Sequence, residues 1–338
     1  MGVSQLNKQS PVKDGPEHIG FLLLPQFAML SLFCALEPLR VANRFGGDLY
    51  SWHFFSQDGE PVISSSGIPV AVETGLDGLE RCSILIVDAS FEPEASLTPE
   101  LLSRLRQLDR KGMVIGAMDT GCYALAHAGL LENHRTTLHW ESLAAFKEAF
   151  PKIRTTTKLF EFDENRFSCS GGTAAIDMML HMIRQRHGAE LSRKVSDQFI
   201  HERIRGTQDH QCLDAGRRLN IHHPQLVQVV EVMEQNLEEP LDISELATVV
   251  QLPLRCLQRL FHKQLNSTPT RFYLQLRLER ARQLLRQTQM PVVEVGIACG
   301  FHSPEHFSRS YKSCFGLSPR TDRKQDLELQ RMALQRGC

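Results

Sequence analysis

The stretch MVIGAMDTGCYALAHAGLL, residues 113–131, has the order of residues that enzymes use to build a nucleophile elbow. An apolar strand at residues 113–115 leads into a short turn that contains Gly, Asp and Thr, and a helical stretch follows. A turn between a strand and a helix raises one side chain above the edge of a sheet, where it can attack a substrate. The residue in that position is Asp119, and Cys122 comes three residues later.

A carboxylate at the elbow cannot act as a thiolate nucleophile, and the sequence offers no substitute pair of nucleophile and base. Cys122 falls one turn into the helix, where its direction differs from that of the elbow side chain, so a small packed residue is the favoured interpretation. Asp119 is expected to cap the helix, because a carboxylate accepts hydrogen bonds from the first free amides. The sequence therefore predicts no catalytic residue and leaves a ligand-binding role for Asp119.

Strands and helices alternate through the first part of the chain. Apolar runs of strand length occur at residues 18–25, 50–57, 68–73, 82–90 and 113–119. Helices are expected over residues 30–43, 99–111, 122–131, 140–149 and 173–188, with a hairpin around Asp163–Asn165. This alternation is typical of a mostly parallel sheet covered by helices on both sides. We therefore expect a flavodoxin-like α/β domain with Asp119 at the end of a strand.

The last part of the chain carries a concentration of positive charge. Residues 251–324 contain 13 Lys and Arg but only 4 Asp and Glu, and the rest of the chain contains 25 basic and 35 acidic residues. The net charge of −1 therefore conceals a basic block. Such a block on an acidic chain is typical of a nucleic-acid-binding module. A solvated charged face is the alternative, and charge alone does not exclude it.

The basic block contains an internal repeat. Segments that start at Glu245 and Glu294 match at an offset of 49 residues in their first helix and 50 in their second. Each copy is predicted to be a short helix, a turn of small residues and a second helix, which is the helix-turn-helix pattern. A longer helix, RFYLQLRLERARQLLRQ, joins the copies. We therefore expect an all-α domain with two helix-turn-helix motifs.

The second helix of each copy separates apolar from polar side chains. The expected packed sides are Leu254, Leu257, Leu260, Phe261 and Leu265 in the first copy and Phe307, Tyr311 and Phe315 in the second. The outward side chains, which could reach base edges and phosphates in the major groove, are Arg255, Gln258, Arg259, His262, Glu305, His306, Ser308, Arg309 and Lys312. Arg259 and Arg309 could instead serve packing or phosphate contacts. For the domain as a whole, the alternative is a helical bundle that binds protein.

Residues 223–325 resemble the AraC/XylS family of bacterial transcription activators. The segments MPVVEVGIACGFHSPEHFSRSYKSCFGLSP and RLERARQLL match the signature of that family nearly throughout. The pattern is long and specific, so the resemblance implies sequence-specific binding to double-stranded DNA.

Residues 17–200 resemble the PfpI-type domain of the class-I glutamine-amidotransferase superfamily. The resemblance is carried by FLLLPQFAMLSLFCALEPLRVAN, by the elbow, by AHAGLLENHRTTLHWE and by FSCSGGTAAIDMMLHMI. Enzymes of that superfamily place a cysteine at the elbow, where this chain has Asp119. The resemblance also implies that Glu37 lies beside the elbow and that His139 and Trp140 lie close to the same pocket.

The resemblance thus implies a non-catalytic ligand pocket that is formed by Glu37, Asp119, Thr120, His139, Trp140, Gly171 and Gly172. Two carboxylates would favour a cationic ligand, and an aromatic ring would help through a cation–π contact. The glycine pair lies between a strand and a helix, which suits either a tight turn or an anion site. A His next to Trp is more often a packed, hydrogen-bonded pair than a ligand contact. A small amino acid or betaine would fit this pocket.

The fusion of the two domains resembles the amidotransferase-like branch of AraC regulators, whose members respond to arginine, glycine betaine, carnitine and related methylamines. It implies a transcription activator of catabolic genes with a sensor domain at 17–200, a linker at 201–222 and a DNA-binding domain at 223–325. The implied partners are double-stranded promoter DNA, a small-molecule effector, RNA polymerase and a second copy of the chain in a homodimer.

Composition limits the other possibilities. Hydrophobic residues make up 42% of the chain and charged residues 23%, and no stretch has the length and apolarity of a membrane span or a signal peptide. Nine scattered cysteines without a Cys-x-x-Cys pair favour a reducing cytoplasm over disulfides or zinc. We expect no metal and no cofactor. Two alternatives stay open: a PfpI-type hydrolase or lyase with a DNA-binding tail, and a repressor or architectural DNA binder without an effector.

Overall fold

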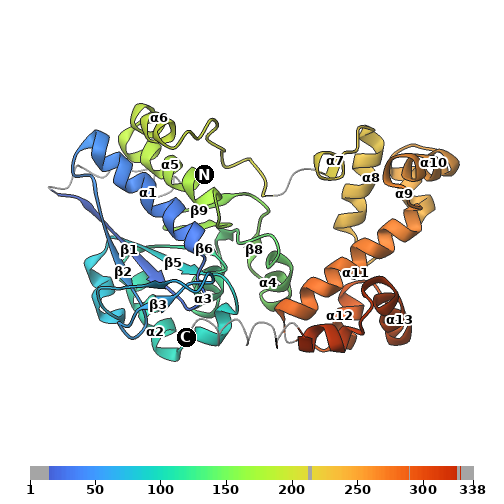
Figure 1. The fold of residues 1–338 in the computed structure, drawn as a ribbon, viewed down its shortest axis with the longest axis horizontal. Helices are drawn as coiled ribbons and strands as arrows, with labels where there is room; N and C mark the ends of the chain where they lie inside the picture. The colour runs from blue at the N-terminus through green and yellow to red at the C-terminus, as the bar shows by residue number, and fades with distance from the viewer. Residues whose placement is uncertain (1–14, 212–214, 289, 326–327, 329–338) are drawn as a thin grey trace. The chain divides into compact units, whose positions relative to one another are not determined.

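The first part of the chain is built around a six-stranded sheet (Figure 1). The computed structural model describes residues 15–211, 215–288, 290–325 and 328. The chain divides into two units, and the boundary between them falls between Gln211 and Cys212.

The sheet has the strand order β2-β1-β5-β6-β10-β9. Its strands are β1 (Glu17–Leu23), β2 (Tyr50–Phe55), β5 (Ile84–Ala89), β6 (Val114–Asp119), β9 (Phe160–Asp163) and β10 (Arg166–Cys169). All neighbours are parallel except β9 and β10, which form the expected hairpin. Because strand order reverses beside β1, the arrangement is that of a flavodoxin-like sheet. The predicted fold class of this unit is confirmed.

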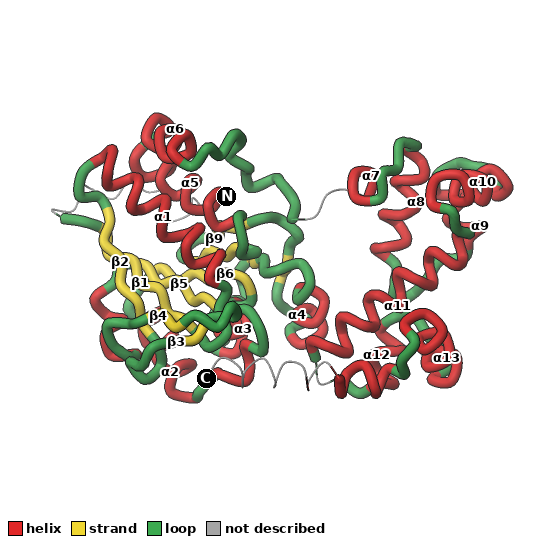
Figure 2. Tube along the Cα trace, viewed as in Figure 1, coloured by secondary structure: helices red, strands yellow, loops and turns green. Residues whose placement is uncertain are grey.

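Helices cover both faces of the sheet (Figures 1 and 2). One face carries α1 (Met29–Gly46), α5 (Ala174–His187) and α6 (Ala189–Gln198), which share one apolar core with the sheet. The other carries α2 (Pro99–Arg110), α3 (Cys122–His127) and α4 (Leu143–Ala149), which share a second core. Two cores explain why the central strands are apolar on both sides.

Several short elements differ from their predicted extents. The strand expected at 68–73 is only β4 (Pro69–Val70), which pairs with β3 (Val62–Ile63) outside the main sheet, since proline cannot donate to a sheet ladder. Helix α3 ends at His127 rather than 131, because Gly129 takes a left-handed φ of 74°. Helix α4 begins at Leu143 rather than 140. The remaining short elements are β7 (Arg135–Thr136), β8 (Arg154–Thr155), η2 (Leu76–Arg81) and η3 (Pro93–Ser96).

In its described residues the second unit is helical. Its helices are α7 (Ala215–Arg218), α8 (Pro224–Gln235), α9 (Ile243–Val249), α10 (Leu254–Leu265), α11 (Pro269–Gln287), α12 (Val292–Ala298) and α13 (Pro304–Phe315). Helices α9 and α10 form one helix-turn-helix pair at one end of α11, and α12 and α13 form another at the opposite end (Figure 1). Among the helices in the described ranges, none is long and apolar enough to cross a membrane.

The two pairs repeat the same backbone turn. Gln251 and Gly300 both have a left-handed φ, of 54° and 74°. The amide after each of them donates to the carbonyl of Ala247 or Gly296 at 2.9 Å, which closes the end of the first helix in the same way. A Cβ on Gly296 would lie 3.1 Å from the ring of Phe307, so a small residue lets the two helices of the pair approach closely.

Polar contacts hold the second pair to α11. The guanidinium of Arg277 donates to the carbonyl oxygens of Cys299 and Gly300 and lies 4.3 Å from the ring centroid of Phe301. The buried carboxylate of Asp322 accepts hydrogen bonds from Arg282, Arg286 and the hydroxyl of Tyr311. These bonds fix the orientation of α12 and α13 within the unit.

Candidate functional site

The predicted elbow is present at the end of β6. Asp119 is the last residue of this strand and has a left-handed φ of 55°, a conformation that costs free energy for a residue with a Cβ. Its side chain leaves the sheet at the edge where the parallel strands end, and the residue is 7% exposed. The geometry of a nucleophile elbow is therefore retained around a carboxyl group.

The glycine turn between β10 and α5 packs directly against the elbow. Gly171 has a φ of 82°, and a Cβ there would lie 2.8 Å from the Cβ of Asp119 and 2.9 Å from the hydroxyl of Ser31. The amide of Gly172 donates to this hydroxyl at 2.7 Å, and the amide of Gly171 donates to the sulfur of Cys169. Since both amides have partners within the chain, a ligand carboxylate would need other donors.

Helix α1 reaches the elbow through Ser31 rather than through Glu37. The carboxylate of Glu37 accepts a hydrogen bond from Arg40 at 2.6 Å on the same helix, and the pair is partly exposed. Ser31 is fully buried and touches the glycine turn. Six residues of helix separate the two by about 9 Å along the axis and place them on different faces. The structure thus gives the elbow a neutral hydroxyl where the resemblance implied a second carboxylate.

The other predicted pocket residues line the loops around the elbow. The hydroxyl of Thr120 donates to the carbonyl of Ser90 at 2.6 Å and ties the elbow to the end of β5. The amide of His139 donates to the carbonyl of Asp119 at 3.3 Å. The ring of Trp140 lies 5.8 Å from that of His139, and the residue is 44% exposed. An aromatic surface therefore lies next to the backbone that contacts the elbow.

Burial governs the ionisation of the elbow groups. Burial is the largest effect and raises the pKa of Asp119 to about 7. A hydrogen bond from Ser90 lowers this pKa, and the charge of Glu141 raises it. Burial lowers the pKa of His139. The prediction that Asp119 caps the next helix is wrong: α3 begins at Cys122, Gly121 occupies the cap position, and no side chain caps it. The carboxyl of Asp119 is therefore not committed to the helix.

Cys122 is a packed thiol. Its sulfur is fully buried, donates to the carbonyl of Thr137 and lies 3.3 Å from the hydroxyl of Thr136. Burial raises the pKa of this thiol to about 12, so the thiolate is essentially absent at neutral pH. This side chain cannot replace the missing nucleophile of the elbow.

The first half of the segment His201–Gln211 is bound to α5, close to the glycine turn. Asp177 is fully buried and accepts hydrogen bonds from the ring of His201 and from the amide and guanidinium of Arg205. The guanidinium of Arg205 also donates to the hydroxyl of Thr173 at 3.0 Å. Asp177, which is bonded to His201 and Arg205, thus holds the first half of the segment to α5.

The second half of the segment is bound to the stretch between β8 and β9 and to the residues that follow β7. The amide of Leu159 donates to the carbonyl of Asp209, and the amide of Gln211 donates to the carbonyl of Thr157. The side-chain amide of Gln211 donates to the hydroxyl of Thr137 and to the carbonyl of Leu138, both at 2.9 Å. Leu138 precedes His139. Much of the predicted linker at 201–222 is therefore part of the first unit, and residues 212–214 lie outside the described residues.

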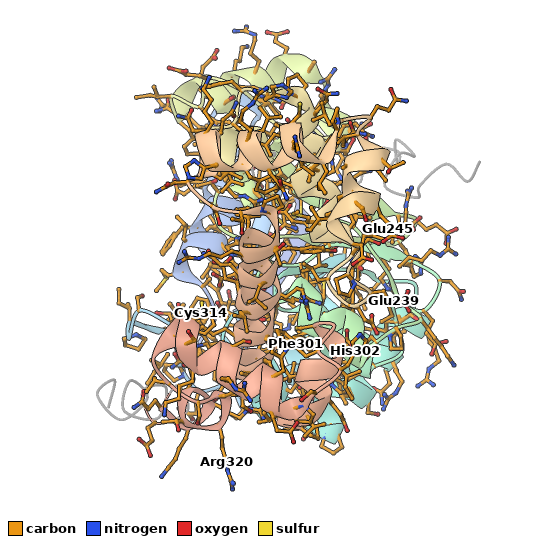
Figure 3. All side chains as sticks on the ribbon, turned by 90° about the vertical axis from the view of Figure 1, so that its right-hand side faces the viewer. Glu239, Glu245, Phe301, His302, Cys314 and Arg320 are labelled. Carbon is orange, nitrogen blue, oxygen red and sulfur yellow. The ribbon has the colours of Figure 1, made fainter. Side chains whose placement is uncertain are left out.

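The outward sides of α10 and α13 have the predicted composition. Every side chain proposed to reach DNA is exposed: Arg255, Gln258, Arg259, His262, Glu305, His306, Ser308, Arg309 and Lys312. Leu257, Phe261, Phe307 and Tyr311 are buried as expected, whereas Leu254, expected to pack, is 41% exposed at the first turn of α10. Figure 3 shows His302 where the turn leads into α13 and Arg320 pointing away from the helices.

Comparison with known proteins gives the class of the chain. Residues 246–325 match a family of helix-turn-helix domains. The HTH-type transcriptional regulator CdhR of Pseudomonas aeruginosa is 50% identical over 303 residues, which cover 90% of each protein. A crystal structure of an AraC family transcriptional regulator from Pseudomonas putida covers 54% of this chain and 100% of its own, with 29% identity and a TM-score of 0.51. The chain is a DNA-binding transcription regulator.

More particularly, the chain belongs to the AraC family, as its two helix-turn-helix motifs indicated. A THiJ/PfpI family protein from Pseudomonas syringae, 18% identical, shares the fold of the first unit with a TM-score of 0.50 and covers 65% of this chain and 87% of its own. The predicted resemblance to AraC regulators is confirmed, and for the PfpI-type domain the predicted fold is confirmed. Because the named relatives are regulators, the chain is not an enzyme, and the hydrolase alternative is set aside.

The ionisation of Asp119 gives a test of its environment. An acid whose pKa is raised by folding stabilises the folded form below its ordinary pKa and loses that contribution as pH rises toward 7. We expect Asp119→Asn to match the parent near pH 4 and to exceed it by up to about 4 kcal/mol at pH 8, since a tenfold change in proton affinity is worth about 1.4 kcal/mol. Urea unfolding at several pH values measures the difference. A variant less stable than the parent at pH 8 would contradict it.

Proposed function

We propose that this regulator activates genes for the use of small nitrogen compounds and is controlled by a ligand at the Asp119 elbow. The proposed ligand class is a betaine, carnitine, a methylamine or an arginine-like compound. The chain is proposed to work in the cytoplasm as a homodimer that binds promoter DNA and contacts RNA polymerase. The established part is DNA binding by an AraC-family regulator.

One observation carries the proposal of ligand control. The segment His201–Gln211 is bonded to α5, which follows the glycine turn, and to Leu138, which precedes His139. The second unit begins at the next residue, Cys212. A ligand that shifts the start of α5 or the loop at Leu138 is proposed to change the bonds of this segment, because Arg205 is bonded to Asp177 and Gln211 is bonded to Leu138. A ligand shifts an equilibrium only through contacts that differ between two states, and we propose these bonds as such contacts. An architectural DNA binder would have no need of them.

The chemistry of the pocket supports a cationic ligand with an anionic group. Asp119 offers a buried carboxyl that is not committed to helix capping, and Trp140 offers an exposed aromatic face. Gly171 lets the backbone approach Asp119 closely, and Gly172 supplies a left-handed φ of 54° in the same turn. Thr120 and His139 hold the surrounding loops. The guanidinium of Arg205 lies beside Thr173 at the start of α5 and would receive a ligand carboxylate. We propose no direct contact between Glu37 and the ligand.

The exposed residues of α10 and α13 support two kinds of DNA contact. Arg255 and Gln258 lie on the first half of α10 and are proposed to read bases, since Arg and Gln form bidentate bonds with guanine and adenine. Lys312, near the end of α13, is proposed to meet a phosphate.

This division predicts different losses. Arg255→Ala should weaken binding to the preferred site by about 1–3 kcal/mol and relax specificity at one position. Lys312→Ala should weaken all sequences alike and lower the salt slope by about one. Titrations of the full chain on duplexes selected from random sequence, at several salt concentrations, measure both. Unchanged affinity and preference after Arg255→Ala would remove α10 from the base-reading role.

Ligand control is tested by a panel and one variant. Glycine betaine, carnitine, L-arginine and tetramethylammonium are titrated calorimetrically into the full chain, and duplex affinity is measured with each. We expect at least one to bind and to change DNA affinity by about 5- to 150-fold, the usual range of coupling between sites. Gln211→Ala removes bonds to Thr137 and Leu138, so it should keep both affinities within about threefold and reduce the coupling to nearly none.

Gln208→Ala is the matched control, because Gln208 is an exposed residue of the same segment. It should leave the coupling intact. If no compound of the panel binds, the ligand class is wrong. If Gln211→Ala couples as the parent does, the segment is not the route between the units.

A further inference from the structure

Asp88 is a second buried carboxyl next to the elbow. It is the next-to-last residue of β5, and its Cα is paired with those of Leu23 and Met118 on the neighbouring strands. The residue is fully buried, and neither carboxyl oxygen has a hydrogen-bond partner in the described chain. Buried polar side chains in proteins nearly always have such a partner, so the position of this group calls for an explanation beyond packing.

The side chain of Asp88 lies on the face of the sheet beneath α1 and α5. Side chains alternate along a strand, and Ile84 and Ile86 belong to the core on that face, so Asp88 shares it. Cys169 of β10 belongs to the same core, and the charges of Asp119 and Asp88 both act on its thiol. The amide of Gly171 donates to that sulfur. Asp88 therefore lies on the core side of the place where Asp119 and the glycine turn meet.

Electrostatics couple the two carboxyls. Burial raises the pKa of Asp88 well above its usual range, and the charge of Asp119 raises it further. The surrounding charges are Glu141, which also acts on Asp119, and Asp177, which is paired with His201 and Arg205. Two neighbouring carboxyls in a buried site do not both ionise readily, so the pair keeps a proton near neutral pH.

We propose that Asp88 is the inner carboxyl of the effector site: it holds a proton in the free protein and gives it to solvent when a cationic nitrogen compound binds at Asp119. The inference rests on the proposed function and deepens it. The O–H bond of Asp88 breaks, the proton passes to the buffer, and no other covalent bond changes. The positive charge of the ligand takes the place of the proton between the two carboxylates. Ligand charge, not shape alone, then selects the effector.

Proton counting tests this without any variant. The compound of the panel that binds is titrated calorimetrically into the full chain at pH 8 in phosphate and in Tris, whose ionisation enthalpies differ. The dependence of the measured heat on the buffer gives the protons released per ligand. At pH 8 Asp119, whose pKa is about 7, is mostly ionised already. A proton released at this pH is therefore expected to come from Asp88, up to one per ligand. Affinity should rise with pH, by up to tenfold per unit where a full proton is released.

Two variants assign the proton. Asp88→Asn keeps the shape, so it should fold with an unchanged or raised melting temperature, release almost no proton at pH 8 and bind the compound at least tenfold more weakly. Glu161→Gln is the matched control: Glu161 is also a buried carboxyl with an oxygen that lacks a hydrogen bond, but it lies on β9 and pairs with Lys158. It should leave proton release and affinity unchanged.

The outcomes separate the two proposals. Binding without proton release in the parent, or equal release in Asp88→Asn, overturns the role of Asp88 and leaves the regulator and its cationic ligand in place. Failure of every compound in the panel to bind the parent overturns the ligand class and the role of Asp88 together.

Discussion

The first unit depends on the contact between a residue with a strained backbone and a residue without a side chain. Asp119 takes a left-handed φ at the end of β6, and Gly171 approaches it so closely that a Cβ could not be accommodated. This contact brings the start of α5 against the elbow, and Ser31 of α1 closes the same point. Asp177, on the first turn of α5, then lies where it holds the segment that leads out of the unit. The strained backbone at Asp119 thus helps to position the glycine turn and the start of α5.

The buried carboxyls of this unit fall into two kinds. Asp177 has His201 and Arg205 as partners, so its burial is compensated and it acts as a structural anchor. Asp88 and Asp119 have no cation within hydrogen-bond reach in the described chain, so they destabilise the free fold once they ionise. Proteins keep such groups mainly where binding needs them, because stability is given up there for function. Asp88, Asp119 and Asp177 are all buried, so burial does not distinguish them. Their hydrogen-bond and ion-pair partners do distinguish the structural carboxyl from the two candidate ligand-binding carboxyls.

Sequence reasoning recovered what depends on local order. Strand–helix alternation predicted the sheet, the strand–turn–helix sequence predicted the elbow at Asp119, and helical spacing predicted the buried sides of α10 and α13. It missed what depends on contacts between distant segments. Ser31, Asp88 and Arg205 lie near the elbow or the start of α5 only because segments far apart in the sequence converge there. Their spacing in the sequence does not predict this. The capping role of Asp119 failed because the turn continues through Gly121 before the helix begins. A charged residue inside an otherwise apolar strand, as in ILIVDAS, was the one available signal for Asp88.

The second unit is a repeat whose copies are anchored to α11 by different chemistry. Beside the first copy, the hydroxyl of Tyr273 on α11 bonds to the connection between α8 and α9, where it donates to the carbonyl of Asn236 and accepts from the amide of Leu241. In the second copy the anchors are charged, through Arg277 and the bonds to Asp322. The charged set fixes the second pair to α11, and the first pair packs against the same helix through the rings of Phe261 and Phe272. The spacing of α10 and α13 is therefore a property of the unit itself. Under the proposed ligand control, a signal from the first unit is therefore expected to change the availability of α10 and α13 together. Moving one of them alone would break buried polar bonds, and each unpaired group would cost free energy.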